Sequence, residues 1–216
     1  MSTIEYAQRL LNAGELEEAE LEGILQGRVT EQALRSRGKK VDVDTHPART
    51  AMLMATKAVK GLGEETRYYA DFVELFVASL ERFLHLSCIL STVPVSQEEL
   101  AERHHVWGVA QHITGDVSMV DGILAKEPVF LALASKYAGF EITEMNDDAI
   151  DALEEFINVV NGLYIVELAN HKMEPDLEYP RAAENVIPHG SQQLALRVYT
   201  EEIGRASCRE RVCQYV

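Results

Sequence analysis

The chain has 216 residues and a net charge of −15, from 35 Asp and Glu against 20 Lys and Arg. This acid excess argues against nucleic-acid binding, because phosphate backbones are bound through Lys and Arg. Apolar residues make up 47% of the chain, enough for a buried core, and no apolar run reaches the length of a membrane-spanning helix. Three scattered cysteines and the lack of a signal-peptide pattern at the start predict a cytoplasmic protein without a disulfide framework.

The negative charge is concentrated in one part of the chain. Residues 1–68 carry a net charge of −1, whereas residues 69–204 hold 7 Lys and Arg against 23 Asp and Glu, a net of −16. From residue 204 onward the sequence turns basic, has no helical or strand periodicity, and resembles translated adaptor or vector sequence. We therefore predict that residues 204–216 are a non-native tail outside the fold. Cys208 and Cys213 form no CxxC pair, so we expect no zinc site there.

Residues 1–65 predict a helical N-terminal segment. Apolar residues such as Leu10, Leu11, Ile24 and Leu25 recur at helical spacing, with glycines as breaks between the helices. No chemical motif is found in this segment, so its role stays open.

Residues 67–203 predict a second, larger domain. A helix is expected over 67–88, with an apolar stripe of Phe72, Leu75, Phe76, Leu80, Phe83 and Leu84. After a break at 92–97, strands are expected over 106–114 and 117–125, joined by a two-residue turn at Gly115-Asp116. We take Cys88, at the end of the predicted helix, as an apolar filler.

Two more helices and two strands complete this domain. Pro128 and Gly139 mark the ends of a short helix over 127–138, and Asn146 caps a long helix that runs to about residue 171. Final strands are expected over 186–188 and 194–199, with His189-Gly190 in a loop between them. This order predicts an α+β fold, with an antiparallel β-sheet packed against long α-helices and a helical N-terminal extension.

The long helix carries the most informative pattern. At 100° per residue, one face holds the apolar side chains of Ile150, Leu153, Ile157, Val160, Tyr164 and Leu168. The opposite face holds a polar stripe of Asp151, Glu155, Asn158 and Gly162. Such a stripe can be an ordinary solvated face. However, Asn and Gly weaken a helix interior, and departures of this kind tend to coincide with function.

The spacing of these residues resembles the signature of the CheC/CheX/FliY family of chemotaxis phosphatases. The match consists of Asp151, Glu155 and Asn158 on one helix, followed by Gly162 and, further on, Pro180. The Thr-Gly-Asp turn of the predicted hairpin and the short helix after it also resemble the family. Only 21 residues separate Asn158 from Pro180, so the equivalence of this proline stays open.

The resemblance points to the CheX type, which carries one copy of the signature and whose members are dimers. The predicted helix from residue 68 has Ser79, but Phe83 and Leu86 stand where a second signature would require Glu and Asn. Members of the family hydrolyse the aspartyl phosphate of a CheY-like receiver domain in chemotaxis or related two-component signalling. The resemblance implies that Asn158 positions the attacking water, and that Glu155 pairs with the receiver's lysine while Asp151 extends the contact. No cofactor of the chain's own is implied, because the receiver brings the Mg²⁺.

Other interpretations stay open beside this one. The chain could be a non-catalytic adaptor of the same fold that binds a receiver, or a structural component of the flagellar switch. His104, His105 and His112 lie near or on one predicted strand, but positions 105 and 112 face opposite sides, so we expect no metal site. Trp107 is expected in the core or at a dimer contact, and Arg181 near the docking face.

Overall fold

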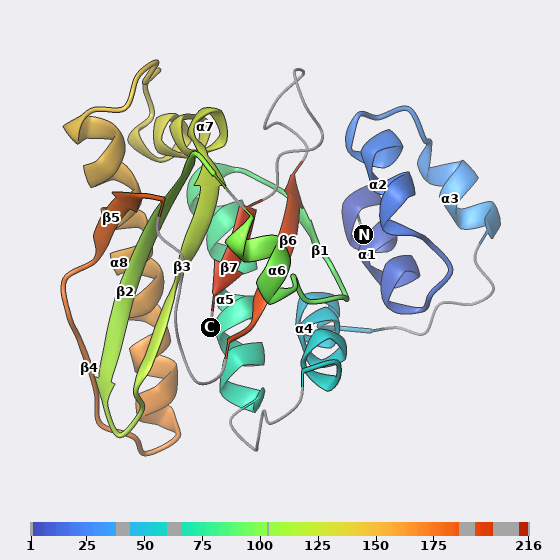
Figure 1. Ribbon diagram of the computed structural model, residues 1–216. Helices are drawn as coiled ribbons and strands as arrows, with labels where there is room; N and C mark the ends of the chain where they lie inside the picture. The colour runs from blue at the N-terminus through green and yellow to red at the C-terminus, as the bar shows by residue number, and fades with distance from the viewer. Residues whose placement is uncertain are drawn as a thin grey trace.

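The computed structural model describes residues 2–37, 44–59, 66–102, 104–185, 193–200 and 212–215. Its strands form one antiparallel sheet, and helices pack around this sheet (Figure 1). The helices are α1 (Thr3–Asn12), α2 (Glu18–Leu25), α3 (Glu31–Arg37), α4 (Pro47–Lys57), α5 (Thr66–Leu84), α6 (Gln97–Ala101), α7 (Glu127–Ala138) and α8 (Asp147–Asn170). The strands are β1 (Cys88–Leu90), β2 (Val106–Gly115), β3 (Met119–Lys126), β4 (Pro175–Leu177), β5 (Arg181–Glu184), β6 (Ala195–Thr200) and β7 (Val212–Tyr215).

The described strands form a seven-stranded sheet in the order β1-β6-β7-β3-β2-β4, with β5 also paired to β2. Every pair in it is antiparallel. In the long β2–β3 hairpin, the strand register places Gln111 directly opposite Asp121. The predicted α+β fold with an antiparallel sheet is confirmed.

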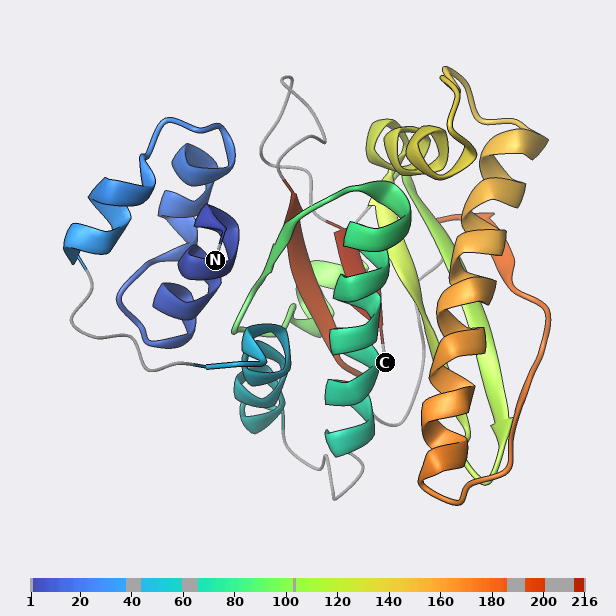
Figure 2. The ribbon, with the colours of Figure 1, turned by 180° about the vertical axis from the view of Figure 1, so that it is seen from behind.

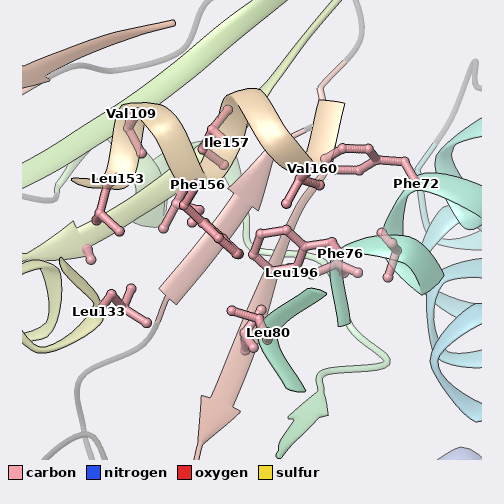
Figure 3. Close-up of a cluster of buried hydrophobic side chains, with 14 of the residues drawn as sticks. Phe72, Phe76, Leu80, Val109, Leu133, Leu153, Phe156, Ile157, Val160 and Leu196 are labelled. Atoms are coloured by element: carbon pink, nitrogen blue, oxygen red, sulfur yellow. The ribbon is translucent and has the colours of Figure 1, made fainter. Parts of the chain in front are cut away.

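Helices α5 and α8 lie side by side on one face of the sheet and enclose the main core (Figures 2 and 3). The predicted stripe of α5 faces inward, with Phe72, Phe76, Leu80 and Leu84 buried. Phe76 meets Phe156 of α8 edge to face, with ring centroids 6.1 Å apart. This packing holds α8 firmly against the sheet and leaves its far side to solvent.

The second face of the sheet is covered at the β1–β6 end. Ile89 and Tyr199 point away from the main core, because successive residues of a strand face opposite sides. They join an apolar cluster formed by α1, α2 and α3, which the figures show beside β1 (Figure 1). The buried side chain of Gln8 accepts a hydrogen bond from the Leu90 N–H at 2.6 Å and donates one to the Leu90 carbonyl at 3.0 Å. The outer edge of β1 is therefore closed by a side chain.

Several sequence predictions are confirmed closely. Short helices fill the described part of residues 1–65, and α7 spans 127–138 with Pro128 in its first turn. Gly139 ends α7 in the left-handed region at φ 77°, which glycine adopts without strain. The Asn146 side chain caps α8 by accepting a hydrogen bond from the Ala149 N–H.

Other predictions are corrected by the structure. Helix α5 ends at Leu84, so Cys88 lies in strand β1 and not at a helix end. The break at 92–97 leads into α6, which was not predicted. The connection of the hairpin is longer than two residues, because β2 ends at Gly115 and β3 begins at Met119. Gly115 (φ 97°) instead allows the Glu174 carbonyl to approach where a Cβ would stand.

The segments after α8 differ from the prediction as well. No strand was expected directly after α8, but the chain there forms β4 and β5, which both pair with β2; residues 172–174 and 179–180 lie outside these strands. The predicted strand 194–199 is confirmed as β6. The predicted strand over 186–188 and the loop at His189-Gly190 lie outside the described residues.

The prediction that the tail takes no part in the fold is wrong for Val212–Tyr215. These residues form β7, between β3 and β6. The physical reason is that β3 and β6 both present unpaired backbone groups at this position, and an extended segment of almost any sequence can pair with them. The non-native origin of the tail stays a prediction.

Among the described residues, no helix is long and apolar enough to cross a membrane.

Candidate functional site

Helix α8 positions the candidate site. Its cap and two acidic residues in the first turn favour helix formation at the N-terminus. Leu153, Ile157, Val160, Tyr164 and Leu168 are fully buried, as the sequence predicted, and Phe156 and Asn161 are buried beside them. The helix is thus fixed along its whole inner side, which makes its outer side a rigid surface.

The predicted polar stripe lies on that outer side. Asp151 and Glu155 are exposed, whereas Asn158 and Gly162 are half-buried. Glu155 and Asn158, three residues apart, are neighbours on the helix surface. A Cβ added to Gly162 would meet nothing within 4 Å, so no internal contact requires a glycine there. Because a mid-helix glycine costs about 1 kcal/mol relative to alanine, this position lowers stability without a packing benefit within the described chain.

The Asn158 side chain is tied to the sheet beneath it. Its Oδ1 atom accepts a hydrogen bond of 3.0 Å from Nε2 of Gln111 on β2. The same Nε2 atom donates to the backbone carbonyl of Glu178, between β4 and β5, at 2.7 Å. Gln111 is only 2% exposed, so these contacts are shielded from water.

The hydrogen bonds continue inward. Nδ2 of Asn161 donates to Oε1 of Gln111 at 2.9 Å and to Oδ1 of Asp121 at 2.8 Å. Asp121 and Asn161 are fully buried, and Asp121 Oδ2 and Asn161 Oδ1 lack partners among the described residues. Burial raises the pKa of Asp121 to about 8, and the hydrogen bond from Asn161 lowers this pKa only in part. Burial therefore favours the neutral form of the carboxyl group at the inner end of the network.

The rim of the stripe combines charged, aromatic and apolar groups. Tyr137 of α7 lies close enough to Glu155 for its pKa to be raised, chiefly by burial and further by the Glu155 charge. Tyr179 is 90% exposed, in the segment that joins β4 to β5. Leu163 and Val166, exposed on α8, continue the stripe beyond Gly162 as an apolar surface.

The remaining predicted residues are placed as follows. Pro180 is half-buried in the β4–β5 connection, two residues from the carbonyl that binds Gln111. Arg181 is exposed at the start of β5. Trp107 packs on the core side against Phe130, with ring centroids 6.0 Å apart.

No metal centre is formed by the described residues. No group of three or more His, Cys, Asp or Glu in them is arranged to hold an ion. His112 instead contacts Glu178 and the Ser118 hydroxyl at 3.3 Å each. The stripe offers carboxylates, an amide and an open glycine position, which can bind and orient a partner group.

Sequence reasoning missed the residues behind Asn158. Gln111 and Asp121 are polar at strand positions where the alternation requires inward-facing apolar side chains, as at Val109, Ile113 and Ile123. A buried polar residue of this kind normally has a specific hydrogen-bond partner. The polar residues at inward-facing strand positions could be recognised in the sequence, but their hydrogen-bond partners could not.

Comparisons with known proteins identify the fold. Neither the protein-family models nor the curated proteins contain a match. Solved structures do match. A chain of the CheX–CheY–BeF3–Mg²⁺ complex from Borrelia burgdorferi is 16% identical at a TM-score of 0.56, and the match covers 68% of this chain and 95% of that one.

Two further matches agree. A CheC-like superfamily protein from Shewanella sp. PV-4 is 15% identical over 71% of this chain and 97% of its own, at a TM-score of 0.55. The chemotaxis protein CheX from Vibrio vulnificus is 19% identical over 67% of this chain and 97% of its own, at a TM-score of 0.51. The chain thus has the fold of CheX and CheC-like chemotaxis proteins. The sequence resemblance is confirmed at this level.

Proposed function

We propose that this protein is a CheX-type phosphatase that hydrolyses the aspartyl phosphate of a CheY-like response regulator. The observation that carries the proposal is the polar stripe on α8, where the exposed Glu155 and the half-buried Asn158 are neighbours on the helix surface, one turn before a glycine without internal packing. The shared fold supports it, and one structural neighbour was solved as a complex with CheY. A role in CheY-related chemotaxis signalling fits these findings.

The chemistry asks little of the phosphatase beyond positioning. An aspartyl phosphate is a mixed anhydride, so water can attack phosphorus while the bond to the carboxylate oxygen breaks and phosphate leaves. The receiver supplies the Mg²⁺ that neutralises the phosphoryl oxygens, so no cofactor of the phosphatase enters. The Asn158 amide orients the attacking water by accepting one hydrogen bond and donating another. A neutral amide suits this task, because a carboxylate would repel the phosphoryl group.

The acidic residues of the stripe serve docking. In the proposal, Glu155 pairs with the lysine of the receiver site and so sets the register of the complex, while Asp151 extends the contact at its rim. The net charge of −16 over residues 69–204 favours approach of a cationic partner surface. Gly162 leaves room for the receiver backbone close to the helix.

A homodimer, typical of the CheX type, belongs to the same proposal. The edge of β1 at Leu90 is not available for a dimer contact through strand pairing, because Gln8 already binds both outward-facing backbone groups of Leu90. A second copy therefore cannot pair with Leu90 on the outer edge of β1 while Gln8 holds these contacts. Light scattering on the purified protein at several concentrations tests for the dimer, and a monomer throughout would contradict this part.

The test of function is phosphate release from a panel of phosphorylated receivers. We expect Asn158→Ala to lower kcat about 100-fold while receiver binding stays within about threefold, because the amide acts on the transition state. Glu155→Ala should raise KM about tenfold, as expected for loss of a charged docking contact. Asn170→Ala and Glu167→Ala, exposed at the end of the same helix, are matched controls that should behave as wild type.

Two outcomes would oppose the proposal. If Asn158→Ala released phosphate as fast as wild type, the assigned role of Asn158 would be wrong. If the wild-type protein bound a phosphorylated receiver but released no phosphate, the adaptor interpretation would replace the phosphatase.

A further inference from the structure

The orientation of the Asn158 amide can be deduced from the groups around it. An asparagine side chain has a carbonyl oxygen at one end and an NH2 group at the other, and rotation by 180° exchanges a hydrogen-bond acceptor for a donor. The end that faces a docked partner therefore decides what the side chain can do. The contacts of Gln111 fix this choice.

The first constraint is the backbone carbonyl of Glu178. A carbonyl oxygen can only accept, so the group of Gln111 that lies 2.7 Å from it must be the NH2 group. The same NH2 group has its second hydrogen directed at Asn158, 3.0 Å away. The atom of Asn158 that faces Gln111 must then be its carbonyl oxygen.

The second constraint comes from the other end of the network and agrees with the first. The Oε1 atom of Gln111 accepts from the NH2 group of Asn161, whose other hydrogen goes to Asp121 Oδ1. Gln111 and Asp121 lie directly opposite each other on β2 and β3, so the strand register holds both ends of this arrangement. Every hydrogen-bonding group of the buried Gln111 side chain has a partner, and its orientation is unique.

We propose that Gln111 is a positioning residue that locks the Asn158 amide with its oxygen toward β2 and its NH2 group at the surface of α8. This inference rests on the proposed phosphatase function. In it, the exposed NH2 group donates to the oxygen of the attacking water or to a phosphoryl oxygen. The remaining lone pair of Asn158 Oδ1 accepts a hydrogen from the water. Without Gln111 the amide samples both orientations, and only one of them holds the water correctly.

The kinetic test uses Gln111→Met, which keeps the length of the side chain but cannot hydrogen-bond. We expect this change to lower kcat about tenfold with KM unchanged, the loss expected for one well-placed hydrogen bond. Gln8→Met is the matched control, because Gln8 is also buried and doubly hydrogen-bonded but lies against β1. It should lower stability and leave kcat unchanged.

A double-mutant cycle separates positioning from a general structural effect. If Gln111 acts through Asn158, Gln111→Met in an Asn158→Ala background should change kcat by less than about twofold. A further tenfold loss in that background would overturn the inference, because Gln111 would then act by another route.

An NMR measurement tests the hydrogen bonds without any receiver. In ¹⁵N-labelled protein, the side-chain NH2 protons of Gln111 should be protected from solvent exchange, whereas those of Asn158 should exchange rapidly. Asn158→Ala should reduce the protection of Gln111. Exchange of the Gln111 protons at the rate of an exposed glutamine would overturn the inference. Protection of Gln111 in a protein that dephosphorylates no receiver would overturn the proposed function instead, and with it any catalytic role of Gln111.

Discussion

Replacing Asp121 with asparagine should change how stability depends on pH. Burial raises the pKa of Asp121 from 3.8 to about 8. Between these values the folded protein holds a proton on Asp121 that the unfolded chain has released. The free energy of unfolding contributed by this group is therefore fully present below pH 3.8, and it decreases as pH rises until about pH 8.

The size of the effect follows from the same two values. Each pH unit in this window costs about 1.36 kcal/mol, so wild type should lose about 3 kcal/mol of stability from this group between pH 5.5 and pH 8. Asp121→Asn has no proton to release and mimics the neutral carboxyl group, with an oxygen that still accepts from Asn161. Its stability should therefore decrease by about 3 kcal/mol less over the same range.

The assay is urea unfolding at half-unit steps from pH 5.5 to pH 9, followed by the fluorescence of Trp107, the one tryptophan of the chain. Asp176→Asn, at an exposed carboxylate of β4, is the control and should follow wild type at every pH. If the difference in unfolding free energy between wild type and Asp121→Asn stayed constant within about 0.5 kcal/mol, Asp121 would not be held neutral by burial, and the reasoning would fail.

Three further substitutions have definite expected outcomes. Gly162→Ala should raise the free energy of unfolding by up to about 1 kcal/mol and weaken receiver binding several-fold; a loss of stability in urea unfolding would reveal an internal contact at this glycine. Gly115→Ala should lower the free energy of unfolding by about 3 kcal/mol, because the left-handed backbone and the Glu174 carbonyl both oppose a Cβ. A decrease below about 1 kcal/mol would show that the β2–β4 contact adjusts easily to the added methyl group. Gln8→Ala should lower the free energy of unfolding by about 2 kcal/mol, because both Leu90 backbone groups lose their partner. Light scattering should detect association through the freed strand edge. Unchanged stability would contradict the contact between Gln8 and this edge.

The long, strongly periodic elements could be predicted from the sequence. Helices α5, α7 and α8 and strands β2 and β3 carry enough residues for their apolar pattern to be clear, and the caps of α7 and α8 are encoded locally. Strands β1, β4 and β5 have three or four residues each, too few for a periodicity. They exist because a distant strand, such as β2 for Arg181–Glu184, provides the partners for their backbone groups.

The candidate site was predictable only on its outer surface. The stripe of Asp151, Glu155 and Asn158 depends on the geometry of one helix, which spacing alone determines. The contacts behind it join residues 47, 50 and 40 positions apart in the chain. They depend on the register of β2 against β3 and on how α8 lies across them, and neither can be read from local spacing.

The cluster of α1, α2 and α3 lies at the opposite end of the sheet from α8 (Figures 1 and 2). Its anchors are Ile89, Tyr199 and Glu18, the last of which accepts hydrogen bonds from the Ser91 and Tyr199 hydroxyls. Since none of these residues belongs to the stripe, the two ends of the molecule can be occupied at once. A tag, a surface tether or a fluorophore on the N-terminus should therefore leave α8 accessible, so that one molecule can be immobilised and titrated with receivers at its other end.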